Sequence, residues 1–219
     1  MPSPFDQSTY QVRLDWGTAG LARLADADVV VVVDVLRFSS TVIDATASGS
    51  AVALAEAEGW SRNGAAVVAA APSEATVLVG GIRNAAAVAR AVQTIQERRQ
   101  ARTSVAVIAA GELDEAGGRR FAVEDQLGAG AIVSALSDRG IDHTAPDAAV
   151  AAEGFHALRG AVRHMIGASG SGRELAAGVV ATARIEASGL IPTSVADAAV
   201  LDAVDVVPVL HEGSFVRFD

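Results

Sequence analysis

The sequence predicts an α/β fold with a mostly parallel central sheet flanked by helices and short antiparallel strands at the C-terminus. Three observations predict this class. Val29–Val33 is a run of five valines, as expected for a strand that is buried on both faces. Strand-like and helix-like segments alternate along the chain, which is typical of βαβ units. The 219 residues contain no repeat or linker, so we expect a single α/β domain over residues 1–219.

The first half of the chain is expected to begin with a strand at Tyr10–Leu14, where apolar and polar side chains alternate. A short helix is predicted over Ala19–Ala25, before the valine strand. A second helix is predicted over Ser40–Ser48, because Gly49 is a residue at which a helix typically ends. The remaining apolar runs of this half predict three further strands, at Ala51–Leu54, Val67–Ala71 and Thr76–Val79.

The second half opens with Ala85–Arg99, a long amphipathic segment that predicts a helix. Its arginine-rich last turn supports this, because positive charge is stabilised at a helix C-terminus. A strand is predicted over Ser104–Ala109 and a helix over Asp125–Leu136, with a glycine-rich polar loop, Glu112–Arg120, between them. The rest of the chain predicts a helix over Pro146–His164, a turn over Ser169–Gly172, a helix from Arg173, and two strands about a Glu212–Gly213 turn.

The composition excludes several classes of protein. The net charge of -9 argues against nucleic acid as a partner, because binding to a nucleic acid backbone needs a basic surface. The chain has no cysteine, which excludes disulfides and thiol catalysis. No apolar stretch is long enough to span a bilayer, and the N-terminus lacks a basic and then apolar leader. We therefore expect a cytoplasmic protein with no membrane partner.

The polar residues that follow the valine strand form the first candidate site. In open α/β folds, ligands bind at the carboxyl ends of the strands. Asp34 could hold a metal ion or simply pair with Arg37, and Arg37 could bind an anion. Ser39, Ser40 and Thr41 could offer hydroxyls and helix N–H groups to that anion. Ser39 or Ser40 could instead serve only as a helix N-cap.

Two more polar clusters follow predicted strands and precede predicted helices. If the three strands are parallel, these clusters lie at one edge of the sheet and converge on the turn at Asp34. Carboxylates at that edge are the ligands that Mg²⁺ prefers, although at a helix start they could serve only to stabilise the helix dipole. In the same way, Asn84 could be no more than an N-cap. One cluster consists of Arg83 and Asn84, and the other of Glu112, Glu124 and Asp125.

Three stretches carry the polar clusters and their flanking strands and helices: VVVDVLRFSSTV at 31–42, VLVGGIRNAAAVA at 77–89, and AAGE followed by FAVEDQLGAGAIV within 109–133. In their sequence and order they resemble the 2-phosphosulfolactate phosphatase family. The resemblance covers most of the chain and implies an α/β fold. It also implies Mg²⁺-dependent removal of phosphate from 2-phospho-3-sulfolactate, a small anionic phosphorylated substrate, as a step towards coenzyme M biosynthesis.

The resemblance, combined with side-chain chemistry, implies a role for each candidate residue. The expected Mg²⁺ ligands are Asp34, Glu124 and Asp125. Either Asp34 or Glu124 orients a water molecule or attacks phosphorus directly. A haloacid-dehalogenase mechanism is not supported, because Leu36 stands where that pattern needs a second aspartate. The implied catalytic residues are Asp34, Arg37 and Glu124, and the implied substrate-binding residues are Ser39, Ser40, Thr41 and Asn84.

One region departs from the family pattern. Residues 57–75, AEGWSRNGAAVVAAAPSEA, look shortened, and Ala65 stands where a hydroxyl residue is expected. A missing loop would remove backbone N–H groups and hydroxyls from the pocket. The alternative function is therefore a catalytically impaired relative that binds a small anion or a protein partner. Either form could be a homo-oligomer.

Overall fold

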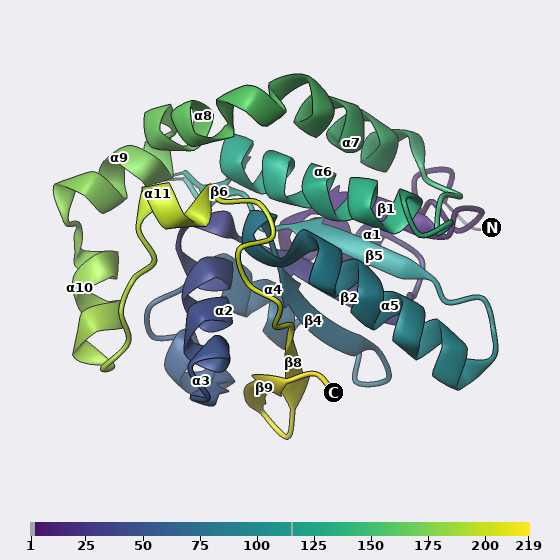
Figure 1. Cartoon of the computed structure of the whole chain (residues 1–219), viewed down its shortest axis with the longest axis horizontal. Helices are drawn as coiled ribbons and strands as arrows, with labels where there is room; N and C mark the ends of the chain where they lie inside the picture. The colour runs from purple at the N-terminus through teal and green to yellow at the C-terminus, as the bar shows by residue number, and fades with distance from the viewer. Residues whose placement is uncertain (1–2, 115) are drawn as a thin grey trace.

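The structure, a computed structural model, describes residues 3–114 and 116–219 (Figure 1). A seven-stranded sheet lies between layers of helices, and its strand order is β1-β5-β2-β4-β8-β9-β3. This arrangement confirms the predicted fold class. The strands are β1 (Val12–Trp16), β2 (Val29–Val33), β3 (Val52–Ala53), β4 (Thr76–Gly80), β5 (Val105–Ala109), β8 (Pro208–His211) and β9 (Ser214–Arg217).

Four adjacent strands, β1, β5, β2 and β4, run parallel, so their carboxyl ends share one edge of the sheet. The C-terminal strands β8 and β9 form an antiparallel hairpin that joins the sheet beside β4, as the sequence predicts. The short strand β3 completes the sheet by pairing with β9. The shared edge is the arrangement on which the predicted convergence of the polar clusters depends.

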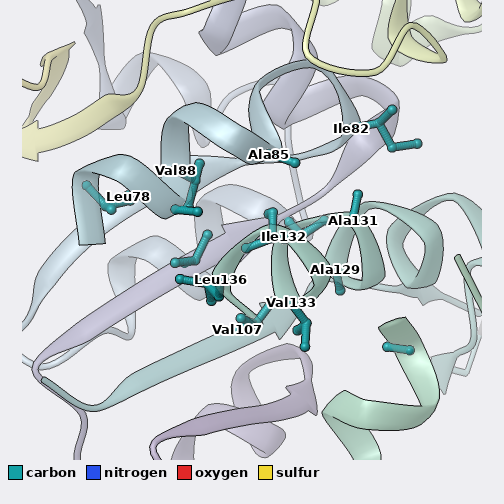
Figure 2. Close-up of a cluster of buried hydrophobic side chains, with 14 of the residues drawn as sticks. Leu78, Ile82, Ala85, Val88, Val107, Ala129, Ala131, Ile132, Val133 and Leu136 are labelled. Carbon is teal, nitrogen blue, oxygen red and sulfur yellow. The ribbon is translucent and has the colours of Figure 1, made fainter. Parts of the chain in front are cut away.

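The valines of β2 are buried on both faces of the sheet, because they alternate between two cores. The odd-numbered valines belong to a core with α5 (Ala85–Arg99) and α6 (Val123–Ser137). Figure 2 shows Val88 and Ile132 of these helices in that core. The even-numbered valines belong to a second core with α2 (Ser40–Ala47) and α4 (Gly64–Ala69). An uninterrupted apolar run therefore fits this position.

The remaining helices surround these cores, and α7 packs along the outer side of α6 (Figure 1). No helix in the described part of the chain is long and apolar enough to cross a membrane. The remaining helices are α1 (Gly17–Arg23), α3 (Leu54–Ala57), α7 (Pro146–Leu158), α8 (Val162–Ala168), α9 (Gly170–Ala177), α10 (Val180–Ala187) and α11 (Val195–Ala198), with the shorter turns η1 (Val35–Ser39), η2 (Ile82–Asn84) and η3 (Arg159–Ala161).

The predicted strand over Val67–Ala71 is wrong, because these residues lie in α4 and directly after it. A short apolar run satisfies the periodicity of either a buried strand or a buried helix. The alanines around it favour the helix. The predicted loop over Glu112–Arg120 also differs from the structure, because it contains a small hairpin of β6 (Glu112–Leu113) and β7 (Arg119–Arg120).

The predicted turn over Ser169–Gly172 is mostly the first turn of α9. The Ser169 hydroxyl oxygen accepts a hydrogen bond from the Gly172 N–H at 3.1 Å, which caps the helix. This cap places Ser171 inside the first turn, where its side chain is buried. A segment that looks like a flexible Gly-Ser turn in the sequence is therefore an ordered part of the fold.

Gly130 allows α6 and α7 to pack closely. A Cβ atom at Gly130 would lie 2.1 Å from the Ala151 carbonyl oxygen, which no real Cβ tolerates. We expect Gly130→Ala to lower the free energy of unfolding by about 1–3 kcal/mol, because the helices must separate. Urea unfolding measures this. The control is Gly154→Ala in α7, where a Cβ meets nothing within 4 Å and a gain of up to ~1 kcal/mol is expected. Equal effects of both changes would contradict the close approach.

Candidate functional site

The carboxyl edge of the parallel strands gathers four acidic side chains. Asp34 follows β2, Glu112 follows β5, and Glu124 and Asp125 lie in the first turn of α6. Asp34, Glu124 and Asp125 are each at least 94% buried, with exposed fractions of 6%, 3% and 3%. The ends of the parallel strands β2 and β5 and the start of α6 therefore bring these carboxylates to one edge of the sheet.

Asp125 connects the ends of β2 and β5. Its Oδ1 accepts a hydrogen bond from the Val35 N–H at 2.8 Å, and its Oδ2 accepts one from the Gly111 N–H at 2.8 Å. Helix α6 begins at Val123, two residues before the predicted start, and Asp125 lies in its first turn. Both carboxylate oxygens therefore bond the turns that follow β2 and β5, so the observed contacts of Asp125 are structural.

Asp34 is a buried carboxylate with a raised pKa. Burial, with smaller contributions from the charges of Glu112 and Glu124, raises the pKa of Asp34 to about 6, although the Gly64 N–H acts in the opposite direction. The Gly64 N–H donates to Asp34 Oδ2 at 2.9 Å. Burial likewise raises the pKa of Asp125 well above its usual range, with Asp34 and Glu124 adding to the effect. Two neighbouring carboxyls therefore resist ionisation.

Ser171 of α9 lies between Glu112 and Glu124. Its Oγ is 2.6 Å from Glu112 Oε1 and also contacts Glu124 Oε1. A serine hydroxyl has one proton to donate, so it can satisfy only one of these carboxylate oxygens. The other oxygen is free to accept from water or to bind a further proton or a cation. This unsatisfied acceptor, together with the raised pKa of Asp34, fits a bound cation with a preference for oxygen ligands.

Within residues 3–114 and 116–219, no three or more Asp, Glu or His side chains are arranged so that they could hold a metal ion together. Mg²⁺, however, is commonly held by one or two carboxylates together with water and substrate phosphate. The four carboxylates at this edge, Asp34, Glu112, Glu124 and Asp125 (the acidic cluster), are enough to supply one or two such ligands. Mg²⁺ binding stays a prediction, and a three-carboxylate site of Asp34, Glu124 and Asp125 is not assembled.

A pocket of about 330 Å³ opens beside the acidic cluster. Arg37 lines it with a side chain that is only 12% exposed. Its Nη1 is buried without a hydrogen-bond partner among the described residues, and its Nη2 lies 3.9 Å from Glu174 Oε2. A guanidinium with unused donors favours an anion. The charged residues that line this pocket are Asp34, Arg37, Arg62, Glu112, Glu174 and Arg184.

A larger cavity, of about 1080 Å³, lies elsewhere, between residues 3–10, the end of β1 and the start of α7. It contains none of the residues that the sequence predicts for the site. Its arginine, Arg23, is already paired with Asp15 at 2.5 Å. The smaller pocket is the better candidate site, because it combines buried carboxylates with guanidinium donors that have no partner.

The hydroxyl residues after Asp34 shape the turn and do not line the pocket. Ser39 Oγ accepts a hydrogen bond from the Asp34 N–H at 2.9 Å and donates to the Val32 carbonyl, and Ser40 Oγ donates to the Val35 carbonyl at 2.8 Å. Neither serine caps α2 through its side chain. The hydroxyl of Thr41 is buried without a partner among the described residues.

Asn84 and Arg83 are also bonded away from the pocket. Asn84 is fully buried; its Oδ1 accepts from the Gly81 N–H, and its Nδ2 donates to the Val79 and Val206 carbonyls. Arg83 donates to Asp44 Oδ1 at 2.6 Å and to the Asp197 carbonyl. The structure therefore does not bring Asn84 to the predicted position beside the substrate. The reason is that its amide closes the turn after β4 and holds the C-terminal segment.

Several pocket residues lie outside the predicted set. Glu112 belongs to the predicted converging clusters but has no role assigned from the sequence. Ser171 bonds Glu112 at the edge of the pocket, and no sequence pattern links it to that distant carboxylate. Residues 60–63 contribute Trp60 and Arg62, and α10 contributes Arg184. Trp60 and Arg62 do have a signal in the sequence, because they lie within residues 57–75, which depart from the family pattern.

The raised pKa of Asp34 predicts a pH-dependent stability. Because the folded protein binds this proton more tightly than the unfolded chain does, the stabilisation is complete below pH 3.8 and is lost as the pH rises through about 6. Without divalent cations, Asp34→Asn should therefore unfold at higher denaturant concentration than the parent at pH 8, by up to about 3 kcal/mol. This difference should shrink towards pH 4. The exposed control Asp142→Asn should show no such trend, and a less stable Asp34→Asn at pH 8 would contradict the prediction.

Comparison with known proteins places most of this site in a recognised family. A model of the 2-phosphosulpholactate (2-phosphosulfolactate) phosphatase family matches residues 60–213, which is more than half of the chain. No curated protein matches the chain. The matched range includes Glu112, Glu124, Asp125 and Ser171, whereas Asp34 precedes it. The match confirms the resemblance found in the sequence.

Proposed function

We propose that this chain, which belongs to the 2-phosphosulpholactate phosphatase family, hydrolyses a small anionic phosphomonoester with the help of Mg²⁺. The family supports a phosphatase, and 2-phospho-3-sulfolactate is the substrate that the family name indicates. The observation that carries the proposal at the level of residues is the pocket beside β2. There, unused donors of Arg37 lie next to buried carboxylates.

The residues of the pocket are suited to separate parts of the reaction. Arg37 binds the phosphoryl oxygens through its free N–H groups and stabilises the charge on them in the transition state. Asp34 receives the proton of an attacking water or attacks phosphorus itself. Without a bound cation the pKa of Asp34 is about 6, and a pKa close to the working pH is what the first role, that of a general base, requires.

The acidic cluster provides the place for the cation. Asp34 and Glu124 would hold Mg²⁺, with Glu112 close to both, and Mg²⁺ would neutralise charge on the phosphoryl group when bound. Asp125 keeps Val35 and Gly111 in place, so it positions the turn that presents Asp34. Ser171 keeps α9 against the carboxylates.

The test is phosphate release by the purified protein from 2-phospho-3-sulfolactate and from simple phosphomonoesters. We expect release with Mg²⁺ and loss of release with EDTA. Thermal unfolding with phosphate or sulfolactate is measured in parallel. Stabilisation by these ligands without any phosphate release would overturn the proposal in favour of the impaired relative that only binds an anion.

A further inference from the structure

Helix α9 is attached to the rest of the protein mainly through one polar side chain. The whole of α9 lies in the described part of the chain, and within it only Ser171 and Gly172 are buried. Gly172 has no side chain, and Leu175 is only partly buried against the core that contains α5 and α6. The attachment of α9 therefore depends on the hydroxyl of Ser171, which is 2% exposed, where most helices bury an apolar face.

The start of α9 holds Ser171 in place. The Ser169 hydroxyl accepts from the Gly172 N–H and so caps the helix. A Cβ atom at Gly172 would lie 2.1 Å from the Ile166 carbonyl oxygen, so the first turn of α9 packs closely on the end of α8. Ser171 is part of this turn, and it brings α9 against β6 at the acidic cluster (Figure 1).

The contact that Ser171 makes can satisfy only one of its two partners. Its Oγ is 2.6 Å from Glu112 Oε1 and also contacts Glu124 Oε1, but it has a single proton to donate. When both carboxylates are charged, the second one turns a negative oxygen towards the lone pairs of the hydroxyl. The two carboxylates also repel each other, because their shared partner holds them close together. A cation bound beside them would weaken both repulsions and would therefore strengthen the docking of α9.

We propose that Ser171 is a positioning residue that couples the binding of Mg²⁺ at the acidic cluster to the docking of α9. The inference rests on the proposed function, because it takes the cation to lie at these carboxylates. Helix α9 also carries Glu174, which lines the pocket, and it leads directly into α10, which forms part of the same wall. The cation therefore also secures one wall of the pocket. Because coupling is reciprocal, the docked serine raises the affinity for the cation by the same factor.

The test measures amide hydrogen exchange of α9 in the purified protein with and without Mg²⁺. In the parent, Mg²⁺ should slow this exchange by about fivefold or more. Ser171→Ala should exchange rapidly in both conditions and should bind Mg²⁺ about tenfold or more weakly in calorimetry, as expected when a group that orients metal ligands is lost. The control Ser169→Ala removes the helix cap but not the contact with the carboxylates, so its α9 should exchange faster than in the parent and still respond to Mg²⁺.

Glu112→Gln provides a second variant, in which the serine stays. Glutamine keeps an oxygen that can accept from the Ser171 hydroxyl, but it carries no charge. Its α9 should therefore exchange slowly even without Mg²⁺, and Mg²⁺ should add little. If Ser171→Ala does not fold, this variant decides the question. Exchange as fast as in the Mg²⁺-free parent would then contradict the coupling.

The outcomes separate the coupling from the phosphatase function. Exchange of α9 that does not change with Mg²⁺ in the parent, or a Ser171→Ala variant that responds to Mg²⁺ as the parent does, would overturn the coupling. Phosphate release that depends on Mg²⁺ would still leave the phosphatase function standing. A full response of α9 to Mg²⁺ without release from any phosphomonoester would support the coupling and overturn the proposed function.

Discussion

Replacing Asp34 with asparagine is expected to lower kcat by about 10² to 10⁴-fold while the protein stays folded. Asp34 is the carboxylate that closes β2 and lines the pocket, and it is 94% buried. Asparagine keeps the shape of the side chain and an oxygen that can accept from the Gly64 N–H. It cannot receive a proton from water, attack phosphorus or supply negative charge to a cation. Phosphate release at saturating Mg²⁺ measures the loss, and urea unfolding verifies the fold.

The matched control is Glu174→Gln, which removes a carboxylate from the same pocket. Its side chain is 52% exposed and lies 3.9 Å from Arg37, so the change should cost less than about tenfold in kcat. A similar loss of kcat in both variants would show that activity depends on the total charge of the pocket and not on Asp34 in particular. Full activity of Asp34→Asn would reject the catalytic role of Asp34.

The arrangement of the sheet follows from features that one sequence displays. The strand Val29–Val33 and the helix Ala85–Arg99 are found with the predicted bounds, because a five-valine run and a long amphipathic segment have strong periodic signals. Parallel strands bring their carboxyl ends to one edge of the sheet, which is why Asp34, Glu124 and Asp125 could be predicted to lie together, although Arg83 and Asn84 at the same edge bond elsewhere. Neither signal depends on the exact placement of side chains.

The role of each residue inside the site could not be predicted from the sequence. Whether Asp125 holds a metal or two N–H groups depends on the direction of its side chain in the first turn of α6, which no sequence pattern encodes. Asn84 follows a strand of the parallel sheet and is therefore predicted to be a pocket residue. Its amide instead donates to the Val206 carbonyl of the C-terminal segment. Ser171 reaches Glu112 across 59 residues of sequence, and no local pattern encodes that contact.

Replacing Asp125 with alanine is expected to lower the free energy of unfolding by about 2–5 kcal/mol and to reduce activity severely. Two opposing effects determine how much the free energy of unfolding changes. The change leaves the Val35 and Gly111 N–H groups buried without a partner, at about 1–3 kcal/mol each. It also removes a carboxyl whose charge is disfavoured first by burial and then by Asp34 and Glu124. We expect the first effect to win, because both oxygens make well-formed hydrogen bonds.

Comparison with Asp125→Asn separates the two effects. Asparagine removes the charge but keeps the volume and one acceptor, so it leaves one of the two N–H groups without a partner and should destabilise the protein less than alanine does. The exposed Asp138→Ala at the end of α6 should change stability by less than about 0.5 kcal/mol. If both Asp125 variants are more stable than the parent in urea, charge repulsion dominates. The hydrogen bonds of Asp125 to the turns after β2 and β5 would then not be what stabilises the fold there.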